Sequence, residues 1–288
     1  MLQLVLFNLF NGLILGAFFV LAALGLSMIL NLTNVINFAH GNFIALGGYL
    51  AFVLIPFVGF WPALVLAPLL TAVIGFVIEK TMICRIYGRD PIYSLLLTFG
   101  LAFMIEDACR YIWGVNGLPL TTPPSLSAPL SSEFFFVNAY RLFIVAIVFI
   151  AVGGLFAFLR YTRMGMRIRA GIFDLETVSA LGINVRLLRS LNFAGGIFLA
   201  GLAGVLAGGQ IGLNPNMGDT LLLPSFVAII VGGMGSLVGT LLGGLLIGVA
   251  AAITSVFYAP ASDVVIYVIM AIVLLVRPRG LLGEEGMQ

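Results

Sequence analysis

Residues 4–30 read LVLFNLFNGLILGAFFVLAALGLSMIL, a stretch without a single charged side chain. A helix needs about 20 apolar residues to cross the hydrocarbon of a bilayer, so this stretch is long enough to span it. Similar apolar runs occupy 191–213 and 264–276. Residues 145–152 lack the alternation of apolar and polar side chains that a membrane β-barrel would need. The sequence therefore predicts an all-α bundle that crosses a membrane many times.

The composition supports the same fold class. Of the 288 residues, 62% are hydrophobic and 8% are charged, whereas soluble domains average about a quarter charged residues. So few charges cannot cover a surface that faces water. We therefore interpret residues 1–288 as a single transmembrane domain.

Nine apolar segments are expected to be helical, and two of them are short. At about 1.5 Å per residue, 41–55 and 220–232 fall short of the hydrocarbon thickness, which indicates broken or re-entrant helices. The expected number of crossings is therefore eight or nine. The predicted helices are 4–30, 41–55, 61–79, 92–113, 141–159, 191–213, 220–232, 236–257 and 263–276.

The basic residues predict the orientation in the membrane. Eleven of the 13 Lys and Arg residues fall in the stretches 80–89, 160–189 and 277–279. Cytoplasmic loops of membrane proteins carry an excess of Lys and Arg, so these stretches and the C-terminus are predicted to be cytoplasmic. Residues 114–140 hold no basic residue and are predicted to form an extracytoplasmic loop.

Polar residues interrupt the apolar sequence at corresponding places in two halves, 1–140 and 141–288. Each break follows a long helix and precedes one of the short segments. This pattern is typical of inverted-repeat transporters, whose broken helices line the substrate pathway; the alternative is two ordinary polar loops. The candidate pathway residues are Asn34, Asn37, His40 and Asn42 in the first break and Asn214, Asn216 and Asp219 in the second.

The polar residues of the first break also have a purely structural interpretation. They could cap the helix that is expected to begin near Gly41, by accepting hydrogen bonds from its free N–H groups. For His40 alone, a capping or packing role is favoured. A lone histidine with no Cys, Asp or Glu close in sequence makes no metal site, so neither a metal nor a cofactor is expected.

The sequence lacks the motifs of an enzyme. Lys80 is preceded by Glu79 rather than by glycine, so the chain has no phosphate-binding loop and cannot hydrolyse ATP by itself. The H-E-x-x-H and G-x-S-x-G motifs are missing as well. We expect a non-catalytic protein that depends on protein partners and binds no nucleic acid.

Residues 160–190 form a charged segment that is longer than a tight turn. Asp174 can accept hydrogen bonds at the start of a short helix, Glu176 would lie in its first turn, and Gly182 can end it in the left-handed conformation. The apolar side of this helix consists of Leu175, Val178 and Leu181. That side could dock into a groove of a partner protein or rest on lipid.

Several segments carry a resemblance to a known family. They read INFAHG at 36–41, RYTRMG at 160–165, ALGIN at 180–184 and GGMGSLVG at 232–239. In this order and spacing they resemble the LivH branch of the branched-chain amino acid ABC transporter permeases, and the resemblance extends over nearly the whole chain.

Membership of this family would imply one subunit of an importer in the bacterial inner membrane. A LivM-like second permease subunit, two cytoplasmic ATPases and a periplasmic substrate-binding protein would be its partners. The helix at 174–182 would couple it to an ATPase, although Gly171-Ile172-Phe173 departs from the small or polar residues that are common before the aspartate. The resemblance places the coupling surface at Arg169, Asp174, Leu175, Glu176, Val178, Ala180, Leu181 and Gly182.

Two functions are therefore considered. The leading one is the permease subunit of an importer for branched-chain or related amino acids. The alternative is an autonomous carrier or channel for small polar solutes such as urea or amides. The importer would need ATPase partners, whereas the autonomous protein would transport alone in liposomes.

Overall fold

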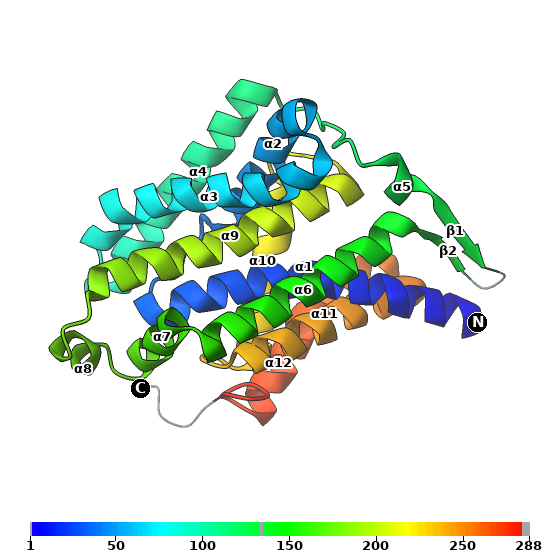
Figure 1. Ribbon diagram of the computed structural model, residues 1–288. Helices are drawn as coiled ribbons and strands as arrows, with labels where there is room; N and C mark the ends of the chain where they lie inside the picture. The colour runs from blue at the N-terminus through cyan, green and yellow to red at the C-terminus, as the bar shows by residue number, and fades with distance from the viewer. Residues whose placement is uncertain (1, 133–134, 284–288) are drawn as a thin grey trace.

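The computed structural model describes residues 2–132 and 135–283, and it is a helical bundle with one short hairpin at its side (Figure 1). The predicted all-α transmembrane class is confirmed. The elements are α1 (Leu2–Thr33), α2 (His40–Val58), α3 (Phe60–Thr81), η1 (Ile83–Arg85), α4 (Pro91–Trp113), α5 (Pro124–Ser127), β1 (Pro129–Ser132), β2 (Phe135–Asn138), α6 (Ala139–Tyr161), α7 (Arg163–Phe173), α8 (Leu175–Ala180), α9 (Val185–Ile211), α10 (Met217–Gly232), α11 (Leu237–Phe257), η2 (Ala259–Ala261) and α12 (Ser262–Val276).

Eight of the described helices are long and apolar enough to cross a membrane. They include α2 with its 19 residues, so the prediction of a short helix at 41–55 is wrong. The apolar sequence continues past Ile55, and the helix runs through Pro56 to Gly59, whose φ of 80° ends it. By contrast, α10 has 16 residues and is the short helix that the sequence predicted at 220–232.

The helices α1 and α9 form the centre of the bundle. An apolar 18-residue window of α1 is 83% buried and that of α9 is 78% buried, compared with 6% in Ala259–Val276 at the edge. The helix α11 packs along α1, and α2 and α3 pack along α9. Glycines allow this close approach, because a side chain at Gly16 would lie 3.0 Å from the Cα atom of Leu245 in α11.

The helices α1–α4 and α9–α12 make corresponding contacts. The packing of α1 on α11 corresponds to that of α9 on α3, and the packing of α2 on α9 corresponds to that of α10 on α1. Likewise, α2 contacts α3 and α4 as α10 contacts α11 and α12. Two four-helix sets with equivalent contacts are what an internal repeat would produce. The helices α6–α8 lie between the two sets in sequence.

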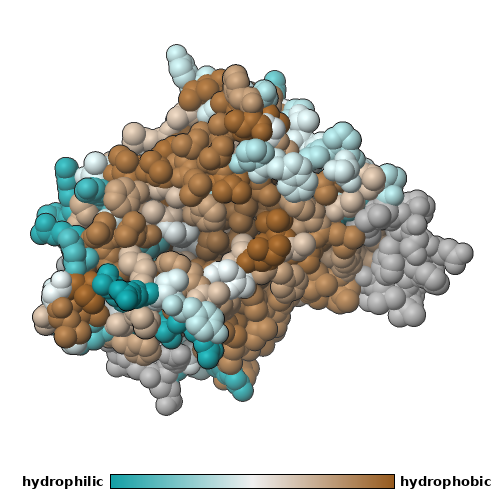
Figure 2. All heavy atoms as spheres, in the orientation of Figure 1, coloured by the Kyte–Doolittle hydropathy of each residue, from teal (hydrophilic) through white to brown (hydrophobic). Residues whose placement is uncertain are grey.

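Charged and polar segments gather at opposite ends of the bundle. The end of α3, the helices α7 and α8, and the start of α9 lie together at the left of Figure 1. The stretch 277–279 packs against the loop between α10 and α11, because a side chain at Gly233 would lie 2.9 Å from the carbonyl oxygen of Arg279. Figure 2 shows hydrophilic residues at the same end, beside an apolar middle. The helix α5 and the hairpin lie at the other end. The three basic stretches thus share one end, as the predicted orientation requires.

Candidate substrate pathway and coupling surface

The first break, residues 34–39, leads from the end of α1 to the start of α2. Asn34 adopts a φ of 54°, a left-handed conformation that asparagine tolerates better than most residues. The Oδ1 atom of Asn37 accepts a hydrogen bond of 3.2 Å from the N–H of Ala39, which forms a turn just before α2. Asn37 therefore has a structural role of the kind considered for this region, although it lies two residues before Ala39, the cap position itself.

Three polar side chains around this break are buried. Asn37 and His40 are 0% exposed, and Asn42 is 1% exposed. The Nε2 atom of His40 donates a hydrogen bond of 3.0 Å to the carbonyl oxygen of Ala22 in α1, so Nδ1 of the neutral ring can only accept. This Nδ1 atom, the Nδ2 atom of Asn37 and the Oδ1 atom of Asn42 have no partner among the residues that the structure describes. Unpaired buried polar atoms are costly, which points to a role other than stability.

The helices that follow the two breaks meet at their starts. A side chain at Gly41, the second residue of α2, would lie 2.6 Å from the carbonyl oxygen of Gly218, the second residue of α10. Neither glycine therefore has space for a side chain, because the backbone of the other lies against it. Helix N-termini carry a partial positive charge. Two such ends lie together here, and Asn42 is the next residue along α2.

The second break, residues 212–216, is held by the long outer loop. Leu213 and Leu118 exchange two backbone hydrogen bonds of 2.8 and 2.9 Å. The side chain of Leu213 is 0% exposed, and it fills the space that side chains at Gly48 and Gly208 would need. The loop predicted at 114–140 therefore packs onto the bundle and fixes the end of α9.

The other candidate pathway residues do not join the buried cluster. Asn34, Asn214, Asn216 and Asp219 are exposed. The Oδ1 atom of Asn216 accepts a hydrogen bond of 3.2 Å from Arg110 of α4, which also forms ion pairs with two acidic residues of its own helix. The seven predicted residues thus divide into three buried ones near the meeting point of α2 and α10 and four exposed ones.

The segment 160–190 contains two helices where the sequence predicted one. Asp174 begins α8, because its Oδ1 atom accepts hydrogen bonds of 3.0 Å from the N–H groups of Glu176 and Thr177. Hydrogen bonds from Thr177 hold the pKa of the Asp174 carboxyl below its usual value. Gly182 follows the helix with a φ of 80°. The predicted start and end of this helix are confirmed, whereas the amphipathic α7 before it was missed.

The exposed apolar side of α8 differs from the prediction. Val178 is 3% exposed and packs against the protein, so it is not accessible to a partner. Leu175 is half-buried, whereas Leu181 is 74% exposed and Phe173, at the end of α7, is 76% exposed. Because α8 rests on the bundle, only one side of it stays free. The remaining predicted coupling residues, Arg169, Glu176, Ala180 and Gly182, are exposed.

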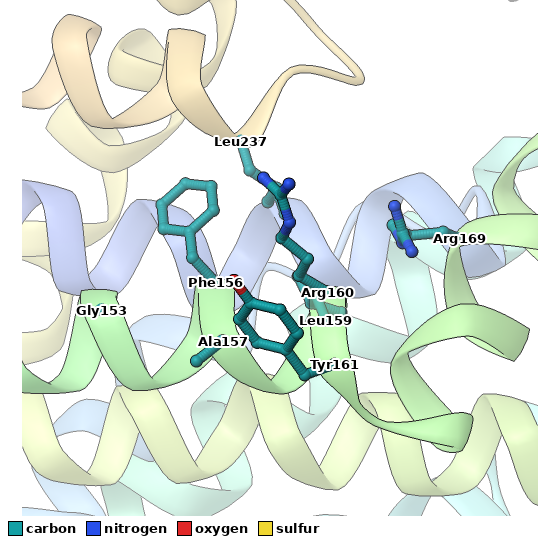
Figure 3. A pocket seen from close by; sticks show the side chains of 8 residues that line it. All are labelled: Gly153, Phe156, Ala157, Leu159, Arg160, Tyr161, Arg169 and Leu237. Atoms are coloured by element: carbon teal, nitrogen blue, oxygen red, sulfur yellow. The ribbon is translucent and has the colours of Figure 1, made fainter.

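A shallow cavity of about 750 Å³ lies beside this segment. Figure 3 shows Arg160 from the end of α6 pointing toward Leu237 at the start of α11, with Arg169 from α7 on the same side. None of the seven candidate pathway residues lines this cavity. It therefore lies at the end of the molecule that carries the basic stretches, and the guanidinium groups of Arg160 and Arg169 make it positive.

A second cavity of about 510 Å³ lies between α1, α6, α9, α10, α11 and α12. It opens near the start of α1 and the ends of α9 and α11. Two opposite charges line it, Arg141 at the start of α6 and Asp263 at the start of α12. A neighbouring cavity of about 350 Å³ shares Arg141 and Gln210 with it and reaches Thr122 of the outer loop.

A family model described as branched-chain amino acid transport system / permease component matches residues 8–274. The chain belongs to this permease family. BraD from Pseudomonas aeruginosa, a high-affinity branched-chain amino acid transport system permease protein, is 33% identical over 98% of this chain and 96% of its own. LivH from Salmonella typhimurium has the same identity and coverage. The resemblance inferred from the motifs is thus confirmed.

The chain is also similar to a second type of permease and to a solved structure. LivM from Escherichia coli is 26% identical over 92% of this chain and 67% of its own. The solved structure of PsaBC from Streptococcus pneumoniae in complex with Fab has a TM-score of 0.50, with 14% identity over 93% of this chain and 91% of that one. At this identity, the structural likeness concerns the fold alone.

Sequence reasoning missed the two opposite charges that line the cavity of about 510 Å³ in this permease. Arg141 and Asp263 lie far apart in the chain, and no short-range spacing connects them. The only sequence signal is their shared position, because each begins an apolar helix at the end predicted to be extracytoplasmic.

Proposed function

We propose that this chain is the membrane-spanning permease subunit of a bacterial ABC importer for branched-chain amino acids. The observation that carries the proposal is its 33% identity to BraD and LivH over nearly the whole of each chain. Eight apolar helices support multi-pass insertion into the inner membrane. By the positive-inside rule, the end with the three basic stretches and the C-terminus faces the cytoplasm.

In this proposal the subunit is non-catalytic and depends on four kinds of partner. Two cytoplasmic ATPases supply the energy, which is consistent with the lack of a phosphate-binding loop around Lys80. A second permease subunit completes the membrane core, and the similarity to LivM supports a related partner. A periplasmic binding protein delivers the substrate to the extracytoplasmic end. The lipid bilayer covers the rest of the apolar surface.

The helix α8 is the proposed coupling helix. Val178 attaches it to the bundle, and Phe173 and Leu181 present exposed apolar side chains on either side of it. An anchored helix flanked by exposed apolar residues suits a groove on a partner. The helices α7 and α9 both contact α8, so a displacement of α8 reaches the central helix of the bundle.

The proposed substrate pathway passes the meeting point of α2 and α10. The support is the buried cluster of Asn37, His40 and Asn42, whose unpaired polar atoms lie next to two helix N-termini. Irregular backbone at membrane depth is tolerated where it lines protein or a solvated path. The exposed residues Asn214, Asn216 and Asp219 lie toward the extracytoplasmic end, and Asn34 lies toward the cytoplasmic end.

Uptake by the reconstituted complex tests the function. Proteoliposomes that hold this chain with its second permease subunit, both ATPases and the binding protein should take up labelled leucine and valine only with ATP. Labelled urea serves as the competing substrate. Uptake by the purified chain alone and without ATP would instead support the autonomous carrier, and uptake of urea but not of leucine would overturn the substrate class.

The coupling role of α8 predicts a specific defect. Asp174→Ala removes the acceptor for two helix N–H groups, so the complex should still assemble and hydrolyse ATP but should lose most of its uptake. Asp174→Asn keeps an equivalent cap and should retain uptake. Parallel measurements of ATP hydrolysis and leucine uptake check this pair. Normal coupled transport in Asp174→Ala would contradict the assignment.

A further inference from the structure

The cavity of about 510 Å³ at the extracytoplasmic end is built from both halves of the chain. Its volume lies within the range of about 300–1,000 Å³ that is usual for small-molecule sites. Six helices contribute to its walls, and several of them do so at their ends. The adjoining cavity that shares Arg141 and Gln210 connects it with the outer loop. A small solute arriving from that side therefore meets a preformed site.

Two opposite charges face this cavity without neutralising each other. Arg141 is held by Asn11, whose Oδ1 atom accepts a hydrogen bond of 2.8 Å from Nη1. Within the described residues, no carboxylate lies within 4 Å of Arg141, and Asp263 has no ion-pair partner. Because they form no ion pair with each other, both charges are available to a ligand in the cavity.

The lining changes from polar to apolar with depth. Gln210 and Ser255 lie in the last turns of α9 and α11, near the mouth. Phe18 lies ten residues beyond Asn8 on α1, about 15 Å further in at 1.5 Å per residue. Ile266, one turn beyond the start of α12, is 3% exposed. The cavity thus combines a charged rim with an apolar floor.

We propose that this cavity binds a small zwitterion with an apolar tail, namely an aliphatic α-amino acid. Arg141 holds the carboxylate, Asp263 holds the ammonium group, and the aliphatic side chain points toward Phe18 and Ile266. The inference rests on the proposed function and deepens it, because it gives the permease subunit its own substrate site at the extracytoplasmic end. A guanidinium suits a carboxylate because it can form two parallel hydrogen bonds.

A phospholipid headgroup that carries a phosphate and an ammonium group, such as phosphatidylethanolamine, presents the same two charges. The edge position of α12 would allow lipid to approach. The apolar floor favours the amino acid, because the chains of a lipid would have to leave the cavity along the membrane. The experiment therefore includes membranes with and without this lipid.

The test measures access to the cavity in the assembled complex. Nanodiscs of phosphatidylcholine hold the complex with Ser255→Cys as the reporter and with Cys84→Ser to remove the exposed native thiol; Cys109 is buried. A membrane-impermeant thiol reagent modifies the reporter, and the mass of this chain gives the rate. Leucine should slow the modification, whereas leucinamide and 4-methylpentanoate, which each lack one charge, should do so about tenfold less effectively.

Variants separate the roles of the two charges. Arg141→Gln should remove the preference for leucine over leucinamide, and Asp263→Asn should remove the preference for leucine over 4-methylpentanoate. Arg141→Lys keeps the charge and should retain part of the protection. Asp107→Asn changes an exposed acid outside the cavity and should behave as the unaltered complex does. Assembly of every variant is checked by size-exclusion chromatography.

Unchanged protection in both Arg141→Gln and Asp263→Asn would overturn the site, and so would equal protection by all three ligands. Protection that requires phosphatidylethanolamine and ignores leucine would assign the cavity to lipid instead. The measurement uses neither ATP nor uptake. A complex that fails to import leucine therefore disproves the proposed function. Equal protection of the reporter by leucine, leucinamide and 4-methylpentanoate disproves only this site.

Discussion

At the scale of single residues, close backbone contacts decide which positions tolerate change. Gly41 and Gly218 bring the starts of α2 and α10 together, and neither has space for a side chain. A glycine-rich sequence shows that close packing is available, but it does not show which glycines meet. Among the pathway residues, the sequence indicated polarity at Asn37 and His40, whereas burial and the bond from His40 to Ala22 came only with the packed helices.

The glycine contact predicts a stability difference between two matched substitutions. Gly41→Ala should destabilise the protein by about 1–3 kcal/mol, because its Cβ atom would lie 2.6 Å from a backbone oxygen. Gly100→Ala in α4 meets nothing within 4 Å and should be neutral or slightly stabilising. Thermal unfolding in detergent, followed by loss of the monodisperse peak, measures both. Equal unfolding temperatures would contradict the tight contact.

At the scale of elements, Tyr87 links a buried acidic side chain at the end of α3 to an arginine at the start of α9. Glu79 is 0% exposed, and its Oε1 atom accepts a hydrogen bond of 2.7 Å from the hydroxyl of Tyr87. The guanidinium of Arg189 lies 4.7 Å from the centre of the Tyr87 ring. Burial, followed by the hydrogen bond to Glu79, raises the pKa of Tyr87 well above its usual value, so the hydroxyl stays protonated and keeps donating.

Removal of this donor should weaken the cytoplasmic end of the bundle. Tyr87→Phe leaves the buried carboxylate of Glu79 without its partner, so a loss of about 1–3 kcal/mol is expected. Tyr111→Phe is the control, because Tyr111 is 92% exposed and its hydroxyl can bond to water. Thermal unfolding of the two variants in detergent compares them. A stability loss of the same size in both would show that the contact is not responsible.

At the scale of the whole molecule, the distribution of charge predicts which end faces the cytoplasm. Cys84 is exposed next to Arg85, in one of the three basic stretches, and Ser125 is exposed in the outer loop at the opposite end. The two positions therefore report on the two sides of the membrane. The fold places the two positions at opposite ends of the bundle. The distribution of Lys and Arg then predicts which of the two ends faces the cytoplasm.

Thiol labelling of intact cells checks this orientation. Ser125→Cys should react with an impermeant maleimide from outside the cell membrane, because its loop is predicted to be extracytoplasmic. The native Cys84 should react only after the membrane is permeabilised, and it serves as the internal control. Buried Cys109 should stay unmodified in both cases. Labelling of Cys84 in intact cells would reverse the proposed topology.

The sequence by itself determined the membrane-spanning class, eight of the helices to within a few residues, and both ends of α8. These depend on local properties: apolar length, the capping ability of Asp174 and the left-handed conformation of Gly182. Only the tertiary structure decided that Val178 is hidden and that Arg141 and Asp263 face one cavity. The physical reason is that helices far apart in the chain pack according to the shapes of their surfaces. Which side chains line the same cavity therefore cannot be predicted from their separation along the sequence.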